Sequence, residues 1–124
     1  MMVGSIKFSL NYRIQGYITI DVEVESYGFK GSYPWCVPEN YLLQKITEFK
    51  LLLDNDCEWR FEETDSDDYL EIKRCHLDVY KGKQVYTVRG QLGGSFNTQY
   101  LVFEYPADKK DVEKYLDNLK NLLH

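Results

Sequence analysis

Apolar and polar residues alternate in the first part of the chain, which predicts two antiparallel strands. Residues 5–12 are apolar at every second position, and residues 17–25 repeat this pattern. A period of two is typical of a strand that buries one face and exposes the other. The connection through residues 13–17 fixes a register in which apolar and charged pairs agree. This register pairs Leu10 with Ile20, Phe8 with Val22 and Lys7 with Glu23.

Residues 28–38 contain two glycines, two prolines and three aromatic residues, and we expect them to form an irregular connection. A helix is predicted next, because Pro38 suits a first helical position and the apolar residues then recur every three or four positions. The apolar stripe consists of Leu42, Ile46, Phe49 and Leu53, widened by Leu43 and Leu52. The helix is expected to end at residues 54–56.

A second hairpin is predicted from residues 57–62 and 69–73, which again alternate. One register satisfies both faces, with apolar pairs on one side and opposite charges on the other. It pairs Phe61 with Leu70, Trp59 with Ile72, Arg60 with Glu71 and Glu58 with Lys73. The apolar phase then shifts, which predicts a bulge near Arg74 and Cys75.

Two more strands and a helix complete the pattern. Lys81-Gly82 is predicted as a turn, and residues 93–96 as another. Between them, Tyr86 and Val88 are expected to face inward. The last strand is expected to place Leu101, Phe103 and Tyr105 opposite Val88, Tyr86 and Gln84, and to end at Pro106. Asp108 is a predicted N-cap, and the closing helix carries the apolar stripe Val112, Leu116, Leu119 and Leu123.

The order ββ-α-ββββ-α predicts a single α+β domain spanning residues 1–124, with an antiparallel six-stranded sheet and two helices packed on one face. No apolar run is long enough to span a membrane, and the N-terminus lacks the pattern of a secretory signal. The net charge of −5 disfavours nucleic acid as a partner. Three cysteines without metal-binding spacing fit a reducing compartment, so we expect a cytoplasmic protein.

No motif in the sequence predicts catalysis, a metal site or a cofactor. His76 is an isolated titratable residue, and Ser95 follows two glycines but lacks the second glycine of a nucleophile elbow. The acidic residues 62–68 lack the glycine and the flanking helices of a calcium-binding loop. Cys57 and Cys75 lie close in the predicted hairpin, either as reduced thiols or as a cross-strand disulfide. We therefore expect a protein that is not an enzyme.

The charge is unevenly distributed, because residues 54–71 contain nine acidic residues and one basic residue. Like charges at one loop tip repel each other, so we expect this crowding not to stabilise the folded state. It indicates either a solvated loop or an acidic surface that attracts a basic protein partner. The predicted partner-binding residues are Glu62, Glu63, Asp65, Asp67, Asp68 and Tyr69. Tyr100, on the uncovered face of the sheet, is a further candidate anchor.

The order of motifs resembles a known family. The stretch Gly28-Phe29-Lys30-Gly31-Ser32-Tyr33-Pro34-Trp35 precedes the leucine-rich helix, and the acidic hairpin, the turn Tyr80-Lys81-Gly82-Lys83 and the closing helix follow. From about Gly28 onward this order is similar to small bacterial immunity-type proteins encoded beside wall-associated polymorphic toxins. The resemblance implies a cytoplasmic inhibitor that binds a toxin's catalytic domain and has no catalytic residues of its own.

Two classes of function therefore remain open. The first is a non-catalytic protein-binding module that neutralises a basic toxin domain through its acidic surface. The second is a structural or assembly module, a homodimer that buries an open sheet edge or the tyrosine-bearing face. A small-ligand enzyme with a pocket under residues 33–35 is a third interpretation.

Overall fold

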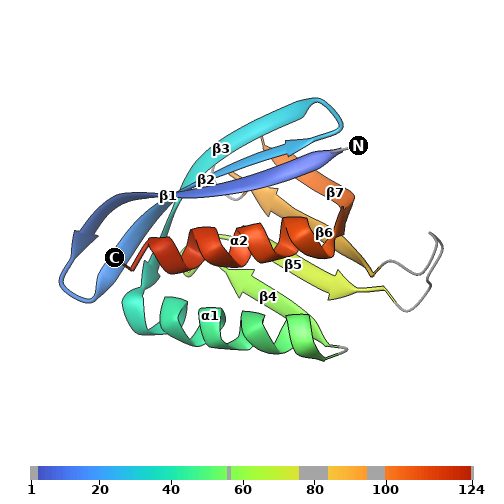
Figure 1. Cartoon of the computed structure of the whole chain (residues 1–124). Coiled ribbons are helices and arrows are strands. Elements are labelled where there is room, and N and C mark those ends of the chain that lie inside the picture. Colours follow the sequence, from blue (N-terminus) through green and yellow to red (C-terminus); the bar gives the residue numbers. More distant parts are fainter. Residues whose placement is uncertain (1–2, 56, 76–83, 95–99, 124) are drawn as a thin grey trace.

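Antiparallel pairing joins the strands into two sheets, and the computed structural model describes residues 3–55, 57–75, 84–94 and 100–123. The first sheet contains β1 (Gly4–Ile14), β2 (Tyr17–Ser26) and β3 (Phe29–Pro38), in that order. The second sheet contains β4 (Glu58–Glu62), β5 (Tyr69–Arg74), β6 (Val85–Leu92) and β7 (Leu101–Asp108), also in chain order. Helix α1 (Glu39–Asp54) connects the sheets, and α2 (Lys109–Asn121) follows β7 (Figure 1).

The prediction of an α+β fold is confirmed, but the single six-stranded sheet is wrong because the segment expected to be irregular forms β3. Tyr27 and Gly28 both adopt positive φ angles, of 50° and 88°, and make the tight turn from β2 into β3. Pro34 is tolerated because β3 lies at the edge of its sheet, where one side of the strand needs no ladder hydrogen bonds. The glycines and prolines of this segment are therefore compatible with a strand, although they made it resemble an irregular connection in the sequence.

The predicted registers of both early hairpins are confirmed. In the β1–β2 pair, Phe8 lies opposite Val22 and Lys7 opposite Glu23, and a bulge separates Leu10 from Tyr12. All four predicted pairs of the β4–β5 hairpin occur, including those of Arg60 with Glu71 and Glu58 with Lys73. The predicted turn at residues 81–82 lies outside the described residues.

The predicted register of the last two strands is wrong by four residues. Leu101 lies opposite Leu92 and Tyr105 opposite Val88. Both registers bury the same face of β7, because a shift by an even number of residues preserves the alternation. Pro106 does not end the strand but pairs with Thr87 inside it, which an edge strand permits.

Each helix buries one apolar stripe, as its spacing predicted. In α1 the buried residues are Leu42, Ile46, Phe49 and Leu52. Leu43, which was expected to widen the stripe, is instead half exposed. In α2 the Asp108 side chain accepts a hydrogen bond from the Asp111 backbone N–H at 2.8 Å, which confirms the predicted N-cap. Tyr115 joins the buried stripe of this helix.

The two helices lie side by side against one face of the second sheet, while the first sheet packs over α2 and the β6–β7 end (Figure 1). Aromatic contacts connect the layers: Phe49 of α1 packs on Trp59 of β4 with ring centroids 4.6 Å apart. Trp35 of β3 stacks on Phe61 at 5.7 Å. One continuous core therefore serves both sheets, and each sheet keeps an outer face that neither helix covers.

Candidate functional site

Asp68 was predicted to bind a partner from an exposed loop tip, but its side chain is buried, with 1% of the residue exposed. Its carboxylate accepts hydrogen bonds from the Trp35 indole N–H at 3.2 Å and from the backbone N–H groups of Gly93 and Gly94 at 2.6 and 2.8 Å. Asp68 thus joins β3 to the end of β6. Its place in the predicted binding surface is corrected to a structural one.

Glu62 and Tyr69 belong to a charged network on the outer face of the second sheet. Arg60 donates to Glu62 at 2.6 Å and to Glu71 at 3.1 Å, and its guanidinium lies 4.1 Å from the centre of the Tyr69 ring. Arg89 donates to the other oxygen of Glu71 at 2.7 Å. The hydrogen bond with Glu62 raises the pKa of Arg60, and the one with Glu71 raises the pKa of Arg89.

The loop between β4 and β5 (residues 63–68, called the acidic loop below) is held by its own side chains. Glu63 accepts hydrogen bonds from the Asp65 backbone N–H at 2.6 Å and from the Ser66 hydroxyl at 3.3 Å. The Thr64 hydroxyl donates to the Cys36 carbonyl at 3.0 Å and thereby fastens the loop to β3. The expectation that the crowded acids of the loop do not stabilise the folded state is therefore wrong for Glu63 and Asp68, because these carboxylates accept specific hydrogen bonds.

Asp65 and Asp67 are exposed on the acidic loop. Tyr100, the further candidate anchor, is also exposed and directly precedes β7. The predicted partner-binding residues are thus close together in the fold, but their roles differ. Glu63 and Asp68 accept hydrogen bonds that hold the loop, while Asp65 and Asp67 are exposed.

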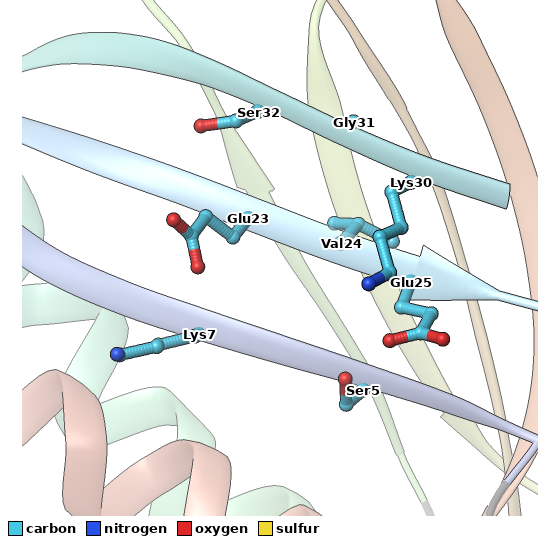
Figure 2. Close-up of a pocket in the computed structure, with 8 residues that line it drawn as sticks. All are labelled: Ser5, Lys7, Glu23, Val24, Glu25, Lys30, Gly31 and Ser32. Atoms are coloured by element: carbon cyan, nitrogen blue, oxygen red, sulfur yellow. The ribbon is translucent and has the colours of Figure 1, made fainter. Parts of the chain in front are cut away.

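The outer face of the first sheet contains an open hollow of about 590 Å³. Figure 2 shows that its charged side chains come from all three strands, with Lys7 on β1, Glu23 and Glu25 on β2, and Lys30 on β3. Lys7 lies opposite Glu23, and Glu25 opposite Lys30, in the strand register. Since two positive and two negative groups balance, this hollow favours neither an anion nor a cation.

A second hollow of about 390 Å³ lies where the acidic loop meets the first sheet. We call it the acidic hollow and define it by the residues Tyr12, Thr19, Tyr33, Cys36, Glu63 and Asp65. Its two carboxylates give it a formal charge of −2, and none of the described residues that line it is basic. Tyr12 and Thr19 were not predicted as binding residues, because they lie on strands remote from the acidic loop along the chain.

Of the other candidates for chemistry, the three cysteines and Trp35 lie in the described part of the chain, and Cys36 lines the acidic hollow. Cys36, Cys57 and Cys75 are free, half-buried thiols, and Cys75 Sγ lies 3.2 Å from the Thr87 hydroxyl. His76 and Ser95 lie outside the described residues. Trp35, expected to cover a ligand pocket, is a buried core residue. Within the described ranges, no group of three or more His, Cys, Asp or Glu side chains is placed to bind a metal ion.

In the part of the chain that the structure describes, neither helix has the length and apolar character needed to cross a membrane. No family model matches the chain, and no match was found among curated proteins or among solved structures.

Proposed function

We propose that this protein is a non-catalytic protein-binding module, and that its binding surface combines the acidic loop with the adjoining outer face of the first sheet. The observation that carries this proposal is the acidic hollow, in which carboxylates from the loop lie beside tyrosines from β1 and β3. Aromatic side chains next to charged groups are typical of binding hot spots. Tyr12 is 51% exposed and is thus available to a partner.

The charge of the molecule supports a basic partner. The chain carries a net charge of −5, and Asp65 and Asp67 present two of its acidic groups on one loop. Such a surface attracts a positively charged protein over a distance and accelerates its association, most strongly at low salt. The fixed conformation of the acidic loop reduces the entropy that binding would cost.

The resemblance to immunity-type proteins suggests the kind of partner. In this proposal the protein is a cytoplasmic inhibitor that covers the catalytic domain of a basic toxin. Inhibition of this kind requires a complementary surface and no reactive group on the inhibitor. The toxin would be the product of the adjacent gene.

Co-expression with the product of the adjacent gene tests the proposal. We expect the two proteins to co-purify, and the double variant Asp65→Asn/Asp67→Asn to weaken the complex at about 50 mM salt by about tenfold, since close charge pairs add to both association rate and affinity. The matched control Glu113→Gln/Asp117→Asn removes two exposed charges from α2 and should leave the affinity unchanged. Equal affinities for both double variants, or the absence of a complex, would contradict the proposal.

A second candidate is self-association through the end of the β1–β2 hairpin. Ile14 and Tyr17 are exposed there, and Tyr17 shares a surface hollow with the half-exposed Leu43 of α1. Exposed apolar groups that lie together favour protein contacts. Sedimentation equilibrium should then give a dimer that Ile14→Ser/Tyr17→Ser converts to monomer. A monomer for the unmodified chain at high concentration would remove this candidate.

A further inference from the structure

We infer that the acidic hollow is a binding site for one cationic side chain, an arginine or a lysine, presented by a protein partner. This inference rests on the proposed function and deepens it, because it names the group that is recognised and the place that receives it. The proposed site includes residues of β1, β2 and β3 in addition to those of the acidic loop.

Thr19 supplies an unused hydrogen-bonding group in the acidic hollow. It lies on the central strand β2, between Tyr12 on β1 and Cys36 on β3, and all three residues line the hollow. Thr19 is only 6% exposed, and its hydroxyl has no hydrogen-bond partner among the described residues. The hydroxyl oxygen is not fully enclosed, so it can accept a hydrogen bond from an N–H group that enters the hollow.

Tyr12 supplies an exposed aromatic ring, and Tyr33, which packs partly against the core, contributes to the edge of the hollow. The bulge between Leu10 and Tyr12 changes the register just before Tyr12. The side-chain amide of Asn11, at the bulge, donates to Asp21 at 3.0 Å and fastens this part of β1 to β2. Tyrosine rings attract ammonium and guanidinium groups through their negative faces. The hollow therefore offers aromatic surface to the apolar stem and the charged head of a long basic side chain.

Glu63 and Asp65 provide the negative charge. Glu63 is held in place because one of its oxygens already accepts two hydrogen bonds from the acidic loop. The bond from Thr64 to the Cys36 carbonyl fixes the loop relative to the floor of the hollow. With a charge of −2 and no basic residue among the described residues of its lining, the hollow is complementary to a cation.

The composition of the hollow favours an organic cation over a metal ion. Only two carboxylates line it, and the other lining residues are uncharged: Asn11, Tyr12, Thr19, Tyr33, Pro34, Cys36 and Ser66. Ca²⁺ needs about six to eight oxygen ligands, which two carboxylates do not approach. A guanidinium group instead presents several N–H donors to carboxylate, hydroxyl and aromatic groups at once. The volume of the hollow, about 390 Å³, also lies in the ordinary range of ligand pockets, roughly 300–1,000 Å³.

The direct test uses the intact chain and a short probe, the peptide acetyl-Gly-Arg-Gly-amide. Titration followed by two-dimensional amide NMR should shift the resonances of Tyr12, Thr19, Cys36 and Asp65 together and to saturation. A peptide with citrulline in place of arginine keeps the shape but has no charge, and it should bind at least about fivefold more weakly, since a hydrogen bond to a charged group is worth more than a neutral one. Equal binding of the two peptides, or shifts spread over the whole surface, would overturn the inference.

Three variants sharpen the test. Asp65→Asn should lower the affinity for the arginine peptide by about threefold, which is the effect of one exposed charge pair. Thr19→Val keeps the shape of the side chain and should lower the affinity for the arginine peptide by about fivefold, because one hydrogen bond is lost. Glu23→Gln removes a charge from the other hollow of the same face and is the matched control, with unchanged affinity expected. If Glu23→Gln lowered the affinity for the peptide as much as Asp65→Asn does, the binding site would not be the acidic hollow.

The same variants separate this inference from the proposed function. If the protein partner binds but Thr19→Val leaves its affinity unchanged, the proposed function stands and the inference is wrong. If the arginine peptide binds in the acidic hollow but no complex forms with the product of the adjacent gene, the cation site stands and the proposed partner is wrong.

Discussion

Asp68 illustrates how one carboxylate can hold distant segments together. Trp35 and the Gly93–Gly94 backbone lie far from Asp68 in sequence, yet all donate hydrogen bonds to its two oxygens. Such bonds to an ionised group are stronger than neutral ones, and a buried donor that loses its acceptor becomes unfavourable. We therefore expect Asp68 to contribute to the stability of the fold.

Replacement of Asp68 by alanine should lower the free energy of unfolding by about 3 kcal/mol, because three donors lose their acceptor at once. Urea denaturation followed by circular dichroism measures this change. The neighbouring Asp65→Ala, at an exposed position, is the control and should change stability by no more than about 0.5 kcal/mol. If the two variants were equally stable, Asp68 would not be the residue that joins β3 to the end of β6.

Two buried tyrosines provide a matched comparison at the same scale. Tyr86 is fully buried and its hydroxyl has no hydrogen-bond partner among the described residues, and burial raises its pKa. The Tyr105 hydroxyl instead lies 2.8 Å from the Tyr115 hydroxyl. Tyr86→Phe should therefore raise the free energy of unfolding by about 1 kcal/mol, whereas Tyr105→Phe should lower it by a similar amount.

Thermal and urea unfolding of these two variants decide the point. Opposite signs are expected, because one substitution removes an unpaired polar atom from the core and the other breaks a hydrogen bond. A loss of stability in Tyr86→Phe as large as that in Tyr105→Phe would show that the Tyr86 hydroxyl makes a favourable interaction.

At the scale of elements, α2 protects the free edge of β1. The Asn118 side chain accepts a hydrogen bond from the Phe8 backbone N–H at 2.6 Å and donates one to the Phe8 carbonyl at 2.8 Å. It thus reproduces the pair of bonds that a neighbouring strand would make. Arg13 also donates to the Leu122 carbonyl near the C-terminal end of the helix. These contacts disfavour pairing between the β1 edges of two copies.

Asn118→Ala should expose this edge and lower the free energy of unfolding by about 2 kcal/mol, since two hydrogen bonds disappear. The open edge should also increase self-association, which analytical ultracentrifugation over a concentration series measures. Asp117→Ala, on the exposed side of the same helix turn, is the control. An Asn118→Ala protein that is as stable and as monomeric as this control would contradict the assigned role.

The strand registers show which parts of the fold the sequence could predict. In the second hairpin, charged pairs identified the register, because a shift by two residues would have set Arg60 opposite Lys73 or Glu58 opposite Glu71. In the first hairpin, the apolar pairs and the pair of Lys7 with Glu23 agreed on one register. The β6–β7 register was predicted from apolar alternation alone and was wrong. The pair of Arg89 with Glu104, which occurs in the observed register, is the signal that would have corrected it. In the same way, Glu25 opposite Lys30 indicates the missed strand β3.

At the scale of the whole molecule, the acidic surface could be predicted but its neighbours could not. The cluster of acids in residues 54–71 is visible in the sequence. The placement of Tyr12, Thr19 and Tyr33 beside the acidic loop depends on how the first sheet packs against the second, and that packing follows from long-range contacts. For the same reason, the sequence could not separate Asp68, which is buried, from Asp65, which is exposed.

The central claim is that the protein acts through the acidic loop and the adjoining face of the first sheet. Amide hydrogen exchange, measured on the free chain and on its complex with the product of the adjacent gene, tests this claim most directly. We predict that binding slows exchange in residues 62–68 and at the hairpin end, residues 11–17, with little change on the exposed side of α2. Unchanged exchange in both segments, together with slower exchange elsewhere on the surface, would contradict the claim.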